Sequence, residues 1–346
     1  MDEVILNKRH PLYQEDLNRI LSLKGIDSLK GRRILITGAT GLIGVHLVDF
    51  LMRLGQVKVI VVGRNTNKAQ TRLGEYFGHP DFEFIEQDVM IPFANSLEAD
   101  VIIPLASNTH PLAYSKFPVE TILTNVRGAE NALDLARRNG ATVLYPSTVE
   151  IYGNSSDQDS FAEGDTGKLN LSTARSCYTE SKRVSEAMCQ SYLSEYGVVS
   201  KIVRLPRVFG PTMLVSDSKA SSQFIKKAIL GEDIVLKSKG DQFFSYIYVT
   251  DAVAALLYVL IHGQSGEAYN VSNVECNCRL KDFARLCAEY CGKSVVFELP
   301  SSVEAKGFSV AERAILDSSK LNELGFVARF GMREAIERTI VLLKQY

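Results

Sequence analysis

The chain has 346 residues, of which 46% are hydrophobic and 23% are charged, and its formal net charge is -1 at pH 7. This composition supports a sizeable core in one large domain or two coupled domains. It argues against a nucleic-acid-binding protein, which would carry a basic excess. An anionic substrate would therefore need a local positive site rather than a positive overall field.

The N-terminal residues, the apolar runs and the cysteine spacing are those expected of an intracellular protein. The N-terminal residues are charged and lack the apolar stretch of a signal peptide. The longest apolar run, residues 252–261, is about half the length that a membrane-spanning helix needs. Four of the six cysteines cluster in the segments CNC and CAEYC, whose spacing differs from the paired CxxC of zinc sites. We therefore expect a soluble cytoplasmic protein with free thiols and no metal.

Hydrophobic periodicity predicts three regions along the chain. Residues 1–30 should form a helical extension, because apolar residues between 17 and 23 recur near helical spacing. From residue 31 strands and helices alternate, which predicts a Rossmann-type, doubly wound parallel sheet over residues 31–204. Strands are expected at 33–37, 57–62, 82–85, 101–105, 142–145 and 198–204, and helices at 42–54, 68–77, 119–138 and 175–196.

The last region, residues 205–346, is expected to form a smaller α/β substrate-binding lobe that partly interleaves with the first. Its helices are predicted at 220–230, 250–262, 279–290 and 332–344. We expect it to close over the carboxyl edge of the parallel sheet, where ligands of such folds bind.

A glycine-rich loop joins the first strand to the first helix. Gly38, Gly41 and Gly44 are spaced three residues apart in TGATGLIG. The first glycine permits a tight turn, the second lets the backbone approach a pyrophosphate, and the third lets the helix pack against the strand. The strand before the loop and the helix after it are the context in which such a loop binds a dinucleotide. Thr40, Leu42 and Ile43 complete the expected cofactor contacts.

The end of the second strand leaves the choice between NAD and NADP open. An acidic residue at this place would bind the adenosine ribose, but the sequence has Gly63, Arg64 and Asn65. Arg64 could accommodate the extra phosphate of NADP, or it could be a solvated loop residue. Asp88, after the third strand, remains available for the adenine end.

Tyr178 and Lys182 form a second motif, separated by one helical turn. A free tyrosine has a pKa near ~10, and a neighbouring ammonium would favour its phenolate form. Tyr178 could then take a proton from a sugar hydroxyl while hydride leaves for a nicotinamide, and Lys182 could hydrogen-bond the nicotinamide ribose. Thr148 ends a predicted strand, where its hydroxyl could hold the reacting oxygen beside Tyr178.

Together these motifs resemble the extended short-chain dehydrogenases, the NAD-dependent epimerase/dehydratase group. The likeness runs from residue 31 to the C-terminus. It is carried by ITGATGLIG, QDV, PLASNT, TNVRGAENAL, STVEIYG, YTESK, RLPRVFGP and YVTDAV. It implies that the first lobe holds NAD(P), the second holds a nucleoside diphosphate sugar, and Thr148, Tyr178 and Lys182 form the catalytic triad. By the same resemblance the remaining cofactor contacts are Val89, Leu105, Ala106, Ser107 and Asn125, and Thr109 contacts the substrate.

Resemblance also implies roles for Glu150, Arg207 and Arg313. Residues 82–89 and 105–128 look most like UDP-glucuronate decarboxylases, in whose loop Glu150 would lie beside the sugar. Val149 stands where dehydratases have an acid and decarboxylases a hydroxyl, and valine can supply neither. Arg207 and Phe244 replace the asparagine and arginine of many relatives, so Arg207 could take over a phosphate contact or form an ion pair. Arg313 matches an arginine that contacts the nucleotide sugar.

Four functions remain open on this basis. An epimerase that passes through a transient ketone is the leading hypothesis, because it needs only the triad and the cofactor. A decarboxylase or dehydratase would in addition need Glu150, and an NADPH-dependent reductase would fit Arg64. A non-catalytic NAD(P)-binding protein is the alternative from another class.

The resemblance implies two properties beyond the reaction. Helices 119–138 and 175–196 pair across a homodimer interface in relatives. The long N-terminal extension is similar to that of a subgroup found with surface-polysaccharide synthesis, some of whose members act on nucleotide-linked polyols. Nucleotide sugars or polyols are therefore the expected partners, and neither nucleic acid nor a membrane is expected.

Overall fold

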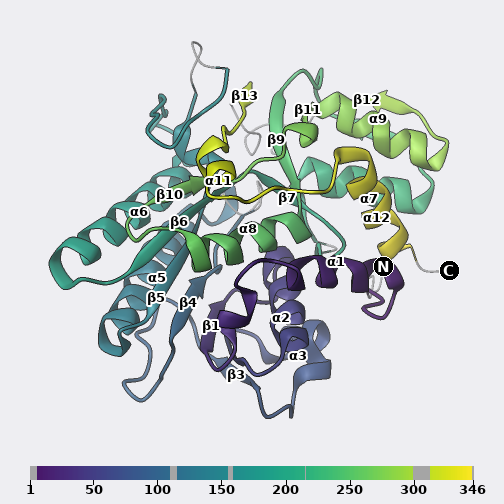
Figure 1. Ribbon diagram of the computed structural model, residues 1–346. Helices are drawn as coiled ribbons and strands as arrows, with labels where there is room; N and C mark the ends of the chain where they lie inside the picture. The colour runs from purple at the N-terminus through teal and green to yellow at the C-terminus, as the bar shows by residue number, and fades with distance from the viewer. Residues whose placement is uncertain (1–5, 110–114, 155–158, 215, 299–311, 345–346) are drawn as a thin grey trace.

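The computed structural model describes residues 6–109, 115–154, 159–214, 216–298 and 312–344. Its centre is a seven-stranded parallel sheet with the strand order β10-β6-β5-β4-β1-β2-β3 (Figure 1). The strands are β1 (Arg33–Thr37), β2 (Lys58–Gly63), β3 (Phe82–Glu86), β4 (Val101–Pro104), β5 (Thr142–Thr148), β6 (Ser200–Leu205) and β10 (Ala268–Asn270). The predicted Rossmann-type fold class is confirmed.

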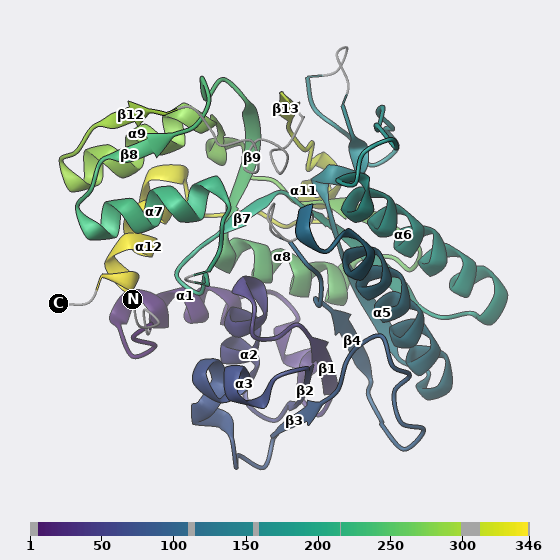
Figure 2. The same ribbon diagram turned by 180° about the vertical axis from the view of Figure 1, so that it is seen from behind.

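Helices cover both faces of this sheet because its strands are apolar on both sides. Within β1, Ile34 and Ile36 belong to one hydrophobic cluster and Leu35 belongs to the other. The first cluster packs against α1 (Pro11–Leu21), α2 (Leu42–Leu54) and α8 (Val249–His262). The second packs against α5 (Pro118–Asn139) and α6 (Ser176–Tyr196), which lie side by side in Figure 2. The short helix α3 (Thr66–Leu73) follows β2.

The smaller lobe contains two short sheets. Strand β9 (Phe243–Tyr248) is central to one of them and pairs with β7 (Arg207–Phe209), β11 (Asn277–Arg279) and β13 (Arg313–Ala314). The other sheet pairs β8 (Ile234–Leu236) with β12 (Val295–Phe297). The helices are α7 (Ala220–Leu230), α9 (Leu280–Cys291), α11 (Ser319–Glu323) and α12 (Met332–Leu343). Because α8 and β10 return to the large sheet, the chain passes back and forth between the two lobes.

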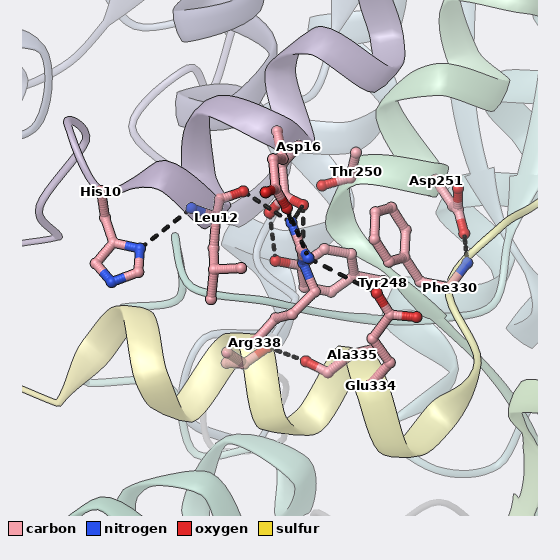
Figure 3. Close-up of polar contacts among 12 residues, drawn as sticks. His10, Leu12, Asp16, Tyr248, Thr250, Asp251, Phe330, Glu334, Ala335 and Arg338 are labelled. Carbon is pink, nitrogen blue, oxygen red and sulfur yellow. Dashed lines mark hydrogen bonds and ion pairs between the residues drawn. The ribbon is translucent and has the colours of Figure 1, made fainter.

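The N-terminal extension is an integral part of the core. It forms α1 and the short 3-10 helix Ile26–Leu29, and α1 runs between the two lobes in Figure 1. Asp16 on α1 is fully buried and accepts hydrogen bonds from Tyr248 of β9 (2.6 Å) and from the guanidinium of Arg338 on α12 (2.8 Å), as Figure 3 shows. The helix is therefore ionically tied to the small lobe.

The same extension also binds the large lobe. Asp49 on α2 is buried and accepts hydrogen bonds from Lys8 Nζ (2.7 Å), the Tyr13 hydroxyl and the Tyr76 hydroxyl (3.0 Å). Lys8 and Tyr13 come from the extension, whereas Asp49 lies on the helix that follows the glycine-rich loop. The extension thus links that helix to β9 and α12 of the other lobe.

The described ranges contain neither a membrane-spanning helix nor a cluster of metal ligands. Among the helices within those ranges, none is both long and apolar enough to cross a membrane. Within the same ranges, no three histidine, cysteine or acidic side chains gather around a common point.

Candidate active site

The candidate site lies along the carboxyl edge of the parallel sheet. The loops that follow β1, β2, β4 and β5 all emerge at this edge, because the strands are parallel. They carry, in that order, the glycine-rich loop, Arg64, residues 105–109 and Thr148. The sheet topology therefore brings together residues that are more than a hundred positions apart in the chain.

The glycine-rich loop has the close approaches that its spacing predicts. Gly38 has a φ of +67°, and a Cβ there would lie 2.6 Å from the backbone nitrogen of Ala106 after β4. A Cβ on Gly44 would lie 2.5 Å from the Cα of Ala39, so α2 packs directly on the loop. Gly41 caps α2 without a side chain to bind the first N–H groups of the helix. Those N–H groups and the positive end of the helix dipole form a cradle that fits a pyrophosphate.

The second part of the edge surrounds Arg64. Its Nη1 donates a hydrogen bond to Glu120 Oε1 of α5 (2.8 Å) and lies 3.8 Å from Asp88 Oδ2. The other oxygen of Asp88 accepts a hydrogen bond from the N–H of Met90 (2.9 Å). Arg64 therefore lies near two carboxylates, one after β3 and one on α5. The sequence alone did not predict this arrangement.

A small pocket lies between this loop region and α5. Asn125 donates a hydrogen bond to Ser181 Oγ of α6 (2.8 Å), which ties the two helices together. Its Oδ1 and the Oγ1 of Thr124 are buried and have no hydrogen-bond partner among the described residues. The pocket is lined by Thr37, Val89, Pro104, Ala106, Thr124, Asn125, Gly128, Ala129, Tyr145 and Lys182. Unpartnered polar atoms beside the glycine loop fit a polar cofactor, because a buried polar group without a partner is costly.

Thr148 and Tyr178 meet at the end of β5. The Thr148 Oγ1 accepts a hydrogen bond from the N–H of Glu150 (3.3 Å) and so caps the 3-10 turn Val149–Tyr152. The Thr148 side chain is also hydrogen-bonded to Tyr178, on the first turn of α6. Both side chains are buried. Two hydroxyl groups predicted to share a reacting oxygen are therefore in contact.

Lys182 is not among the groups that influence the pKa of Tyr178 in this structure, and its predicted catalytic role stays a prediction. The Lys182 Nζ instead donates a hydrogen bond to the carbonyl of Pro146 (2.9 Å) and lies 4.8 Å from the centre of the Tyr145 ring. Burial raises the pKa of Tyr178 to about 12, and it lowers the pKa of Lys182 to about 8. The groups that favour the Tyr178 phenolate are Thr148 and the Arg175 cation, so desolvation outweighs every charge nearby.

Glu150 lies between two arginines next to this pair. Its Oε2 accepts a hydrogen bond from Arg175 Nη2 (3.0 Å), at the start of α6, and its Oε1 is 3.6 Å from Arg207 Nη2, on β7. The guanidinium of Arg207 also lies 3.4 Å from the centre of the Phe244 ring. All three charged side chains are mostly buried, so their attraction is weakly screened. Two guanidinium groups therefore face one carboxylate beside Thr148 and Tyr178.

Comparison with known proteins places this geometry in a family. The model for the NAD dependent epimerase/dehydratase family matches residues 34–272. The chain belongs to this family of nucleotide-sugar enzymes, which uses NAD(P). UDP-glucuronic acid decarboxylase 6 of Arabidopsis thaliana is 39% identical over 241 residues, which cover 70% of this chain and 69% of the plant protein. UDP-glucuronic acid decarboxylase 1 of Xenopus tropicalis is 34% identical over 309 residues, with 89% and 71% covered.

Solved members of the family have the same fold. UDP-glucuronic acid 4-epimerase from Bacillus cereus, in complex with UDP-glucuronic acid and NAD, superposes with a TM-score of 0.78 at 21% identity. That comparison covers 90% of this chain and 99% of the epimerase. dTDP-glucose 4,6-dehydratase from Bacillus anthracis, in complex with NAD, has a TM-score of 0.74 at 19% identity, with 90% and 96% covered. At these identities the superpositions establish the fold alone.

The structure separates two predicted arginines and adds a third, and the predicted contact of Arg313 with the nucleotide sugar stays a prediction. Arg313 is paired with Phe243 across β13 and β9, whereas Arg207 is paired with Tyr246, which lies on the opposite face of β9. Arg313 forms an ion pair with Asp159, with its Nη2 at 3.0 Å from Oδ1. Arg175 was not predicted, although its position three residues before Tyr178 is a signal that could have identified it. Thr109 lies half-buried in the loop after β4, and its role stays a prediction.

Proposed function

We propose that the protein is an NAD-dependent enzyme that decarboxylates a nucleoside diphosphate uronate, as UDP-glucuronic acid decarboxylases do. The observation that supports this most is the pair of guanidinium groups around Glu150, beside Thr148 and Tyr178. Guanidinium groups pair well with carboxylates, and two of them face a single carboxylate here. A substrate carboxylate next to the reacting hydroxyl would be a second anion for this pair to bind.

NAD fits the residues at the other end of the site. The backbone of Gly38–Gly44 would hold the pyrophosphate, and Asp88 would hold the adenosine ribose. Bound NAD would accept hydride from the sugar and later return it. We favour NAD over NADP because Glu120 and Asp88 already face Arg64, and both would repel an additional phosphate.

The reacting sugar hydroxyl would lie at Thr148 and Tyr178. Thr148 would donate a hydrogen bond to its oxygen, and Tyr178, whose phenolate form the positive charge of a bound nicotinamide would favour, would take its proton as the carbon becomes a ketone. The bond to the carboxylate carbon then breaks, CO2 leaves, and the electron pair moves into the enolate of that ketone. Thr148 and the reprotonated Tyr178 hydrogen-bond the enolate oxygen, and a proton then returns to the carbon.

An epimerase is the second candidate, and one observation favours it. Val149 is buried and has no group that moves a proton, so chemistry beyond oxidation and return of hydride has few protein groups to use. An epimerase of this kind would keep the substrate carboxylate and return the hydride to the other face of the ketone. Arg175 and Arg207 would then bind the carboxylate without its loss.

Incubation of the purified protein with UDP-glucuronate and NAD, followed by mass spectrometry of the nucleotide product, tests the proposal. A product lighter by CO2 supports decarboxylation, and a product of unchanged mass but altered retention supports epimerisation instead. Stoichiometric consumption of NADPH would point to a reductase. The Tyr178→Phe variant is the matched control. If UDP-glucuronate is recovered unchanged from the wild-type protein, the proposed function is wrong.

We also propose a homodimer formed through α5 and α6. Phe117, Val119 and Ile122 at the start of α5 and Val184 on α6 are exposed apolar side chains. Such a patch is a candidate protein interface. Sedimentation of the wild-type protein as a monomer would refute the dimer.

A further inference from the structure

The chain segment that follows β7 is buried although it belongs to no helix or strand. Residues 210–213 follow the strand that carries Arg207, and all four are buried. A Cβ on Gly210 would lie 2.4 Å from Val249 Cγ1 at the start of α8, so the segment packs tightly against that helix. Connecting segments usually run over the surface, because buried backbone groups need hydrogen-bond partners. The partners of this segment therefore indicate its role.

Thr212 in this segment is held at two atoms by the lobe that contains the glycine-rich loop. Its side chain is buried, and its Oγ1 donates a hydrogen bond to the carbonyl of Leu42 (2.6 Å). Leu42 is the first residue of α2, directly after Gly41 of the glycine-rich loop. The Thr212 carbonyl in turn accepts a hydrogen bond from the guanidinium of Arg72 on α3. Thr212 is therefore joined to two helices of the large lobe, one of which begins at the glycine-rich loop.

These contacts connect the two ends of the candidate site through a short piece of chain. The glycine-rich loop at one end would hold the NAD pyrophosphate. Arg207 at the other end is five residues before Thr212, and its Nη2 lies 3.6 Å from Glu150 Oε1. Hydride transfer depends on how the nicotinamide and the sugar carbon face each other, and a misplacement of about 1 Å can lower a rate by about 10²-fold. A bond between the two supports is therefore placed where it can affect the reaction.

We propose that Thr212 is a positioning residue that fixes the glycine-rich loop relative to β7 and so sets how bound NAD faces the substrate. Its hydroxyl is engaged with the Leu42 carbonyl, so it acts through the start of α2 rather than on the reacting atoms. The proposal rests on the proposed function in one respect, because Arg207 must hold the substrate. The exchange experiment below uses the protein without substrate or cofactor, so the two can fail separately.

Thr212→Val tests this link because it removes the hydroxyl and keeps the branched shape. The Leu42 carbonyl has two lone pairs and keeps the hydrogen bond of its own helix, so the variant leaves no buried acceptor without a partner. Hydrogen exchange of the free protein, followed by mass spectrometry of peptides, should become about tenfold faster in residues 38–50 and 207–214. Thr212→Ser keeps the hydroxyl and should exchange as the wild type does. Unchanged exchange of residues 38–50 in Thr212→Val would overturn the proposal.

Thr339→Val is the matched control for the loss of a buried hydroxyl. Thr339 is buried, and its hydroxyl donates a hydrogen bond to the carbonyl of Ala335 within its own helix (2.7 Å). The control should leave both segments at the wild-type exchange rate. A general rise in exchange in Thr212→Val, with α5 and α6 included, would indicate a loss of stability only and would contradict the proposal.

Steady-state kinetics with UDP-glucuronate and calorimetry with NAD test the positioning role. Thr212→Val should lower kcat by about tenfold while KM and the NAD dissociation constant change by less than about twofold. Thr212→Ser should restore kcat to near the wild-type value. An unchanged kcat in Thr212→Val would overturn the proposal. If the wild-type protein does not convert UDP-glucuronate, the proposed function is wrong, and the exchange of residues 38–50 alone decides the role of Thr212.

Discussion

The two ends of the candidate site hold opposite balances of charge. At the adenosine end, one arginine, Arg64, faces the carboxylates of Glu120 and Asp88. At the reaction end, one carboxylate, Glu150, faces the guanidinium groups of Arg175 and Arg207. Arg64 is also 55% exposed at its side chain, whereas that of Arg207 is 21% exposed. Water therefore screens the first cluster more than the second.

This difference shows that the local balance of charge in a chain of net charge -1 can differ in sign between two ends of one site. Both Arg64 and Arg207 were candidate phosphate ligands in the sequence. The neighbouring charges determine whether each arginine can bind a phosphate. An arginine that already faces two carboxylates attracts a third anion only weakly. We therefore expect the extra phosphate of NADP to bind poorly near Arg64. We expect an anionic group of the substrate to bind well near Arg207.

The largest expected effect tests whether the reaction takes place at the cationic end. Tyr178→Phe removes the hydroxyl that contacts Thr148. We expect kcat to fall by about 10²- to 10⁴-fold, the usual contribution of a general acid or base. Steady-state kinetics with UDP-glucuronate measures this, with NAD affinity by calorimetry as the control for folding. A kcat close to that of the wild type would show that Tyr178 is not the catalytic acid or base.

The next prediction compares two arginines on opposite faces of β9. Arg207→Met should weaken UDP-glucuronate binding by about 10- to 100-fold, the value of one charged hydrogen bond. Arg313→Met is the matched control and should change binding much less, because its side chain is engaged with Asp159. Binding is measured by calorimetry with both variants. An equal loss of affinity in both variants would show that the two faces of β9 do not differ in their contact with the substrate.

At the adenosine end, removing carboxylates should relax the choice of cofactor. The double variant Glu120→Gln/Asp88→Asn leaves Arg64 without its acidic neighbours, so the affinity ratio of NADP to NAD should rise by about tenfold. Titration of each cofactor by fluorescence gives the ratio. Arg64→Met in the same background should abolish the gain. A ratio that stays at the wild-type value would mean that Arg64 does not reach the cofactor.

The smallest effect concerns Asp251, a buried carboxylate whose hydrogen bonds within the described residues come from backbone N–H groups. Asp251 on α8 accepts hydrogen bonds from the N–H groups of Arg329 and Phe330 (2.9 Å each). Burial raises its pKa to about 6, so the folded protein binds this proton more tightly than the unfolded chain. Its contribution to stability is thus full below the unfolded pKa and is lost as pH rises through about 6.

Asp251→Asn should remove this part of the pH dependence. We expect the Tm of the wild type to fall by about 2–4 °C more than that of the variant between pH 4.5 and pH 7.5. Differential scanning calorimetry across this range measures the difference. Parallel curves would show that Asp251 does not titrate as its burial implies.

Local patterns predicted the fold and the glycine loop, because both depend on neighbouring residues. Strand and helix alternation, the spacing of Gly38 and Gly44, and the place of Thr148 at a strand end are all visible in short windows. The charge balance was not predictable, since Glu120 is 56 positions from Arg64. The bond from Lys182 to Pro146 and the face of Arg313 also depend on tertiary packing. Sequence spacing placed Lys182 on the same helix face as Tyr178, but desolvation decided the pKa of both groups.

The N-terminal helix has a practical consequence for anyone who makes this protein. The family match begins at residue 34, so a shortened chain that starts there would look complete by sequence. It would lack Asp16 and Lys8, and Arg338 and Asp49 would each lose an ionic partner inside the protein. Each buried ion that loses its partner lowers the free energy of unfolding by several kcal/mol. The net free energy of unfolding of a domain is only about 5–15 kcal/mol. Shortened versions should aggregate, and activity assays should use the chain with its first helix intact.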